Sequence, residues 1–113
     1  MKLPEQGHLL RIFVGESDKH DHMPLYEWIV RKARECGLAG ATVVRGLQGF
    51  GPTSRVYTSK ILRLSEDLPI IIEIVDTKEK FDKFWPIIQD VIPEGLVTIE
   101  EVQVKFYCGG KVS

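Results

Sequence analysis

Three glycines within six residues, Gly46, Gly49 and Gly51, are the part of the sequence best suited to binding. They follow a hydrophobic run at residues 41–44 and precede a polar, basic stretch at residues 53–67. Glycine lets the backbone adopt positive φ and approach a ligand or another chain closely. Connections of this length usually carry function or are mobile. We therefore predict a long loop at residues 48–67 with a glycine-rich base at residues 46–51; a bulged turn is the alternative explanation.

Histidine and cysteine offer little further chemistry. His20 and His22 could both reach a metal from an extended segment, but no third ligand stands nearby, so we interpret residues 20–22 as a solvated loop. Cys36 and Cys108 have neither metal-ligand nor redox spacing, which predicts reduced, structural thiols. No Ser/His/Asp or Cys/His constellation and no P-loop is visible. We expect no catalysis.

Composition indicates an ordinary globular protein. The chain has 113 residues, 43% hydrophobic and 27% charged, with a net charge of −1. This length predicts a single domain over residues 1–113. The charge argues against nucleic-acid binding, which needs an excess of Lys and Arg. No apolar run reaches the roughly 18 residues of a membrane span, and the first residues lack a signal peptide, so we expect a cytoplasmic protein.

The first half of the chain predicts a strand, a helix and a second strand. Residues 8–15 alternate as a strand, with Leu10, Ile12 and Val14 on one face. A helix is expected from Pro24 to Cys36, with Leu25, Trp28 or Ile29, Ala33 and Cys36 as its apolar stripe. The second strand is expected at residues 40–47. Within the following loop, residues 55–64 alternate loosely and could form a β-ribbon.

The second half repeats the pattern. A third strand is expected at residues 69–75, then a helix capped by Asp76 with Glu79 as the reciprocating acid. Phe81, Phe84 or Trp85, and Ile88 would form its buried stripe. Pro86 predicts a bend or an irregular second half. The fourth strand is expected at residues 96–107, with a β-bulge or a bend near residues 100–101, where its apolar phase changes.

The order β-α-β-β-α-β predicts an α+β, ferredoxin-like fold, an antiparallel sheet with two helices on one face. Strands two and four would lie at the edges, and strands one and three side by side, so Arg11 and Glu73 could pair. The face opposite the helices would carry Leu9, Arg11, Phe13, Val44, Ile71, Glu73 and Val75. That face is too apolar for a monomer, which predicts oligomerisation through it.

Nearly the whole chain resembles the PII-like proteins, specifically an uncharacterised branch related to nitrogen regulatory protein PII. The resemblance is carried by PLYE (24–27), RKAR (31–34), GLAGATV (37–43), RGLQGFG (45–51), ILRLSEDLP (61–69) and EGLVT (94–98). It implies a ferredoxin-like homotrimer with an adenine nucleotide, ADP or ATP, bound between subunits at the base of the loop after strand two, the T-loop. It also implies that this loop contacts a partner protein.

The resemblance assigns the nucleotide site residue by residue. The loop base supplies Arg45, Gly46, Gly49, Phe50, Gly51 and Arg55, and the neighbouring subunit supplies Gly95, Leu96 and Lys105. The facing turn, residues 94–97, has no lysine, so backbone N–H groups and Arg45 or Arg55 must supply most of the positive field. A diphosphate, a monophosphate or another anion therefore stays open beside ATP.

We consider three alternative functions for this sequence. The first is a PII-like regulatory protein in which a small ligand orders the 48–67 loop and changes which partner docks. The second is a ferredoxin-like trimer of the metal-tolerance type, for which His8, His20, His22, Glu73 and Cys108 are the candidates. The third is a small anion-binding enzyme, but residues 16–19, where an acylphosphatase-like fold has its anion loop, do not suit it.

Overall fold

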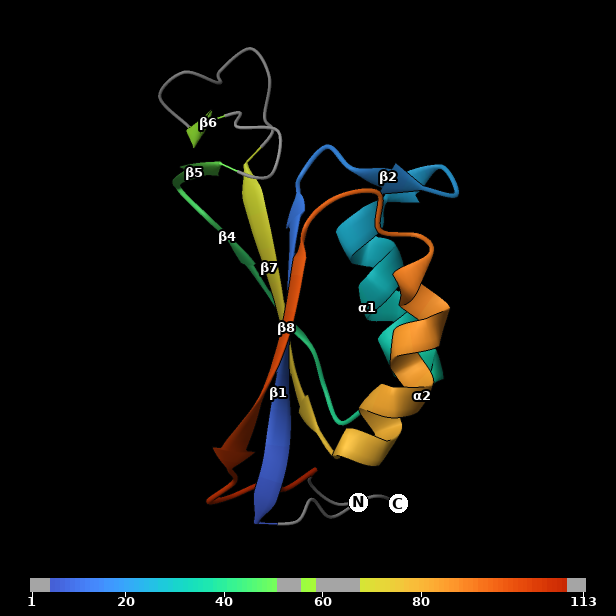
Figure 1. Cartoon of the computed structure of the whole chain (residues 1–113), viewed down its shortest axis with the longest axis vertical. Helices are drawn as coiled ribbons and strands as arrows, with labels where there is room; N and C mark the ends of the chain where they lie inside the picture. Colours follow the sequence, from blue (N-terminus) through green and yellow to red (C-terminus); the bar gives the residue numbers. More distant parts are fainter. Residues whose placement is uncertain (1–4, 51–55, 59–67, 110–113) are drawn as a thin grey trace.

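The computed structural model describes residues 5–50, 56–58 and 68–109. Its main sheet is antiparallel, in the order β4 (Thr42–Arg45), β7 (Pro69–Asp76), β1 (Gln6–Gly15) and β8 (Leu96–Gln103). Helices α1 (Leu25–Glu35) and α2 (Lys78–Gln89) lie together on one side of this sheet (Figure 1). The main elements thus follow the order β-α-β-β-α-β, and the α+β, ferredoxin-like prediction is confirmed.

Two short ribbons accompany the sheet. Strands β2 (Lys19–His20) and β3 (Met23–Pro24) form a hairpin that leads into α1. Strands β5 (Gln48–Phe50) and β6 (Val56–Thr58) pair with each other in the region where the sequence predicted a β-ribbon. Of the ribbon predicted at residues 55–64, only β6 is described; Arg55 and residues 59–64 lie outside the described residues.

The core lies between the helices and one face of the sheet. Alternate residues of β1 and β7 are buried there, as expected from the period of two along a strand. The helices contribute residues spaced three or four apart, which is the period of one helix face. The buried apolar core consists of Leu10, Ile12, Val14, Leu25, Ile29, Ala33, Ile70, Ile72, Ile74, Phe81, Phe84 and Ile88.

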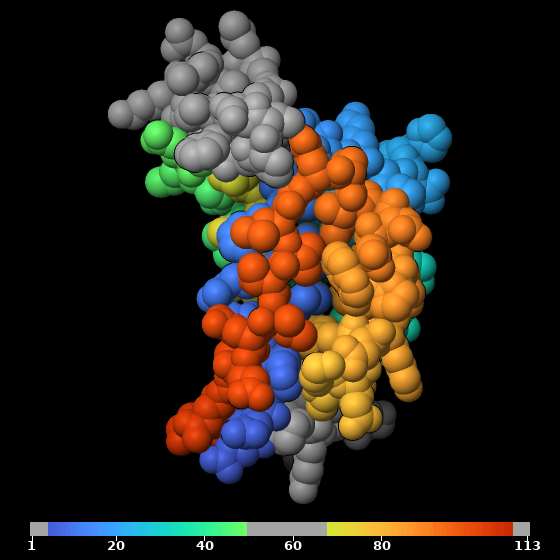
Figure 2. Space-filling view, in the orientation of Figure 1, coloured from blue at the N-terminus to red at the C-terminus, as the bar shows by residue number. Residues whose placement is uncertain are grey.

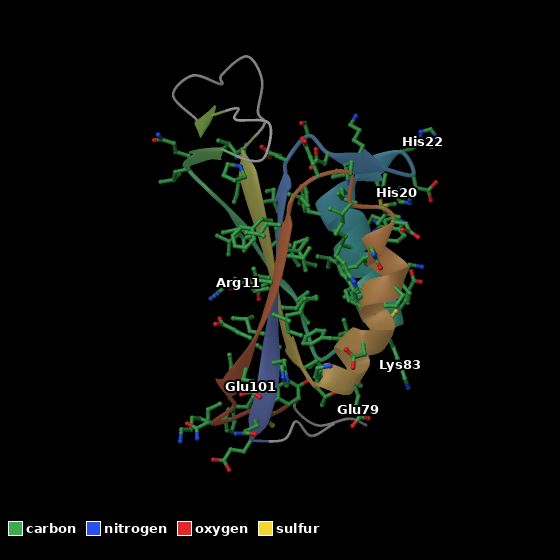
Figure 3. All side chains as sticks on the ribbon, viewed as in Figure 1. Arg11, His20, His22, Glu79, Lys83 and Glu101 are labelled. Atoms are coloured by element: carbon green, nitrogen blue, oxygen red, sulfur yellow. The ribbon has the colours of Figure 1, made fainter. Side chains whose placement is uncertain are left out.

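The other face of the sheet, which we call the open face, is covered by neither α1 nor α2. Strand register places Val44 opposite Ile71, Leu9 opposite Val75, and Arg11 opposite Glu73 on this face. Arg11 Nε donates to Glu73 Oε2 at 2.8 Å, which confirms the predicted pair. In Figure 3 the Arg11 side chain points away from the helices.

A buried carboxylate organises the corner between β7 and α2. Asp76 is fully buried and accepts hydrogen bonds from the backbone N–H of Ala39 at 2.8 Å and of Thr77 at 2.7 Å. The predicted cap is therefore wrong. Thr77 caps α2 and its hydroxyl accepts from Lys80 N at 3.2 Å, because Asp76 is the last residue of β7 and is used to hold the chain before β4.

Two predicted irregularities, a bulge in β8 and an irregular second half of α2, are also absent from the described residues. Strand β8 pairs with β1 in one unbroken register, from Gln6 opposite Gln103 to Phe13 opposite Leu96, so no bulge occurs at residues 100–101. β8 is an edge strand and mostly exposed, so its apolar and polar residues need not alternate regularly along the strand. Helix α2 continues through Pro86 to Gln89 as one helix. Pro86 and Asp82 are both exposed, so the carbonyl that loses its N–H partner can be hydrated.

Several predicted boundaries need smaller corrections. The strand expected at residues 40–47 is Thr42–Arg45, and the strand expected at residues 96–107 ends at Gln103. Cys36 is exposed at the C-terminal cap of α1 and does not belong to its apolar stripe. Trp85 is likewise exposed, and the buried position of that turn belongs to Phe84.

Candidate functional site

The glycine-rich segment begins where β4 ends, and it packs against the start of β7. Gly46 N donates to Pro69 O at 2.7 Å. A Cβ built on Gly46 would stand 2.7 Å from Pro69 Cγ, and one on Gly49 would stand 3.3 Å from the same atom. The backbone at these two glycines therefore lies close to Pro69 of the same chain.

Arg45, the last residue of β4, forms an ion pair across the strand ends. Its Nη2 lies 2.9 Å from Glu16 Oε1, and the two side chains are 51% and 22% exposed. Glu16 directly follows β1, and its backbone N–H donates to Leu68 O at 2.8 Å. The sequence prediction named Arg45 but missed Glu16. The strand order was the available signal, because it brings the ends of β1 and β4 to the two sides of β7.

Gly95 shapes the turn before β8. Its φ is +153°, and a Cβ there would meet Phe13 O at 2.3 Å, so glycine is required. Leu96 follows, 55% exposed and opposite Phe13. This turn and β5 lie at the same end of the molecule (Figure 2). They adjoin, however, opposite edge strands of the main sheet, β8 and β4, which are three strand spacings or about 14 Å apart. One chain alone does not bring Gly95 and Gly46 together.

The remaining predicted site residues lie elsewhere. Lys105 follows the far end of β8, which lies about 24 Å from Leu96 at roughly 3.4 Å per residue, so the structure does not bring it to the glycine-rich segment. Phe50 pairs with Val56 through its backbone, but its side chain is not described. Gly51 and Arg55 lie outside the described residues.

A hollow of about 870 Å³ lies on the open face, toward the end where Lys105 is found. The segment that follows β8 borders it, and Tyr107 of that segment donates from its hydroxyl to Ala39 O at 3.2 Å. The hollow was not predicted. Its lining comprises Leu9, Arg11, Glu73, Val75 and residues 39–42 and 102–107.

Arg11 stands in this hollow between two carboxylates, Glu73 at 2.8 Å and Glu100 at 3.1 Å. The hydrogen bond to Glu73, and the charges of both acids, raise the pKa of the guanidinium above its ordinary value, although partial desolvation opposes this. The stability linked to a raised pKa is present below the ordinary value and is lost only as pH rises through the folded value. Arg11 therefore stays charged in any ordinary buffer.

Residues 20–22, His-Asp-His, lie at the turn between β2 and β3. Asp21 and His22 have φ of 55° and 67°, as a two-residue hairpin turn requires. The His20 ring lies edge-on to Trp28, with centroids 4.7 Å apart. Figure 3 shows His20 and His22 beside the first turn of α1. Across residues 5–50, 56–58 and 68–109, no three His, Cys, Asp or Glu side chains gather as a metal site requires, and no helix has the length and apolar character of a membrane span.

Solved structures identify the fold. CPII from Thiomonas intermedia K12, a PII-like protein whose structure contains ADP and bicarbonate, aligns with a TM-score of 0.65 at 22% identity over 88% of each chain. A proposed PII-like signaling protein from Thermus thermophilus aligns with a TM-score of 0.61 at 20% identity, over 88% of this chain and 89% of that one. At such identities the likeness concerns the fold, and the fold is that of the PII-like proteins.

The sequence then identifies the family. Residues 7–104 match DUF190, described as "Uncharacterized ACR". A UPF0166 protein from Aquifex aeolicus (strain VF5) is 38% identical over 96 residues, covering 85% of this chain and 90% of the relative. A UPF0166 protein from Methanocaldococcus jannaschii is 36% identical over 97 residues, covering 85% and 89%. The chain belongs to the DUF190 family, and the resemblance to an uncharacterised PII-like branch is confirmed.

Proposed function

We propose that this protein is a PII-like regulatory protein that binds an adenine nucleotide, ADP or ATP, between the subunits of a homotrimer. The ligand meets Arg45, Gly46 and Gly49 of one subunit and Gly95 and Leu96 of the next. Binding is read out through the 48–67 segment by a partner protein, and the nucleotide is not turned over.

One observation carries the proposal: the two halves of the predicted site occupy the same end of the sheet but opposite edges. A heterologous contact, in which the β4 edge of one copy meets the β8 edge of the next, closes into a ring when the rotation allows it. Such a ring would bring Gly46 and Gly95 of neighbouring copies together. The proposal does not depend on Lys105, because the length of β8 separates Lys105 from Leu96.

The apolar open face supports an assembly. Val44 at 44% and Leu96 at 55% exposure are both large hydrophobic residues of edge strands. Aliphatic side chains left this exposed around an uncovered sheet mark an interaction surface. A second copy of the chain is the occupant that also completes the site.

Arg45 determines which ligand suits the site. Gly46 N–H already donates to Pro69, so it is not available to a phosphate. The Arg45 guanidinium is half exposed and can bind a phosphate or carboxylate through two donors. A ligand carrying at least one phosphate is therefore favoured over an uncharged nucleoside.

The two other functions receive less support. The metal-tolerance type needs a ligand cluster, and the described residues hold none. The anion-binding enzyme needs an anion loop after β1, where Glu16 is instead an acid paired with Arg45.

A thermal-shift series with ADP, ATP, AMP and cyclic nucleotides tests the ligand, with adenosine as the phosphate-free control. A nucleotide present at about 100 times its Kd stabilises the folded protein by about 2.7 kcal/mol, which raises Tm measurably. We expect a shift with ADP or ATP and none with adenosine. No shift with any adenine nucleotide would overturn the assignment.

A further inference from the structure

The ends of three strands meet around the point where the chain enters β7. Register places Gly15 of β1 opposite Pro69, and Arg45 of β4 opposite Ile70. The first residues of β7 therefore have the end of β1 on one side and the end of β4 on the other. Leu68, just before β7, is buried at 4% exposure and fixes this entry point in the core.

Three polar contacts enclose this entry point. Glu16 N donates to Leu68 O at 2.8 Å, and Gly46 N donates to Pro69 O at 2.7 Å, so two successive carbonyls are bound from opposite sides. The Arg45–Glu16 ion pair, at 2.9 Å, then joins the two sides directly. We call this group of residues the clasp; it consists of Glu16, Arg45, Gly46, Leu68 and Pro69.

The Arg45–Glu16 pair differs from the helix ion pairs of the described residues. Its partners are 29 positions apart and belong to different strand ends, whereas the helix pairs are local. The Glu16 side chain is 22% exposed, against 42% for Glu27 and 63% for Asp82 in the helix pairs. The backbone before Glu16 is also held in place, because Gly15 N donates to the Asp18 carboxylate at 2.9 Å. The acid is thus positioned at Arg45 before any ligand arrives.

We propose that Glu16 is a built-in competitor for the anionic ligand and couples its binding to the loop base. This inference rests on the proposed function, because it concerns the Arg45 site. The Glu16 carboxylate is bound to the Arg45 guanidinium, which is the group that a ligand phosphate would bind. When a phosphate takes Arg45, the ion pair opens and two backbone hydrogen bonds remain at the clasp. Glu16 therefore lowers affinity for anions, and the ligand changes the restraint on both ends of the 48–67 segment.

The binding test compares Glu16→Gln with the wild type by calorimetric titration of ADP. Removing the charge while keeping the shape should tighten ADP binding by about two- to fivefold, the range expected for a partly exposed ion pair. Adenosine affinity should not change. Glu27→Gln, which breaks a surface pair on α1, is the matched control and should leave ADP affinity unaltered. In an Arg45→Gln background the gain from Glu16→Gln should disappear.

A second measurement needs no ligand and separates this inference from the proposed function. Hydrogen exchange of the Gly46 and Glu16 amides should be faster in Glu16→Gln than in the wild type and unchanged in Glu27→Gln. If no adenine nucleotide binds any variant but exchange quickens, the ligand proposal and the competition for Arg45 both fail, and only the restraint that Glu16 places on the clasp is supported. If ADP binds the wild type and Glu16→Gln changes neither the ADP affinity nor the exchange rates, the role proposed for Glu16 is wrong and the proposed function survives.

Discussion

At the scale of single residues, the glycines divide into those that the structure requires and those that it does not. Gly46 and Gly95 each stand against an atom that a side chain would strike, Pro69 Cγ and Phe13 O respectively. A Cβ built on Gly40 would meet no atom within 4 Å, and Gly40 has no positive φ. Glycine in the sequence therefore marks close backbone contact at some positions and mere tolerance at others.

Gly95→Ala should destabilise the protein by about 2–4 kcal/mol, because the added Cβ combines a clash with backbone strain. That Cβ would lie 2.3 Å from a backbone oxygen at a φ of +153°. Urea unfolding at fixed protein concentration measures the change. Gly40→Ala is the control and should stay within about 0.5 kcal/mol of wild type. Equal effects of the two substitutions would show that the turn before β8 is not constrained as described.

The residue scale also shows why part of the site could be predicted and part could not. Gly46 is recognisable from the spacing of the glycines, and Arg45 from the resemblance to the PII-like proteins. Glu16 is not, because its partners are Arg45, 29 residues further along the chain, and Leu68, further still. A lone acid after a strand has many ordinary explanations, and only the register of β1, β7 and β4 singles it out.

At the scale of elements, period and polarity determine the assignments where one face is buried. Strands β1 and β7 alternate cleanly because their even and odd residues face different environments. β8 is exposed along most of its length, so its residues are free to vary and its apparent change of phase carries no structural meaning. Pro86 lies on the solvent side of α2, so the helix continues past it to Gln89.

The N-terminus of α2 provides a test of the corrected cap. Thr77→Ala should cost about 1 kcal/mol, because the hydroxyl that accepts from Lys80 N is lost. Glu79→Ala should cost less than about 0.5 kcal/mol, since Glu79 is exposed and does not complete a capping box with Asp76. Denaturant unfolding of both variants, compared at one protein concentration, measures the difference. A larger loss for Glu79→Ala would restore the cap that the sequence suggested.

At the scale of the whole molecule, the uncovered sheet is the dominant feature. Both helices cover one face (Figure 1), and the register of the strands places aliphatic side chains around the Arg11 ion pairs on the open face. Sequence periodicity predicted both faces correctly, because alternation along β1 and β7 assigns each residue to a side. The hollow beside residues 104–107 could not be predicted, since it depends on the path of the chain after β8.

Val44→Asp should weaken self-association by about 100-fold or more, because it places an unpaired charge on the apolar open face. Ile87→Asp on α2 is the matched control, since the two side chains are 44% and 42% exposed. Sedimentation velocity of the wild type should show a trimer, retained in Ile87→Asp and lost in Val44→Asp. A wild type that is monomeric at micromolar concentration would contradict the assembly.

The central claim is that Arg45 binds the anionic end of an adenine nucleotide, and calorimetric titration of ADP tests it most directly. Arg45→Gln should weaken binding by about 10- to 100-fold, the value of a charge-assisted hydrogen bond. Arg31→Gln, which breaks the Arg31–Glu27 pair on α1, should bind ADP as the wild type does. Binding of ADP with equal affinity by the wild type, Arg45→Gln and Arg31→Gln would contradict the claim.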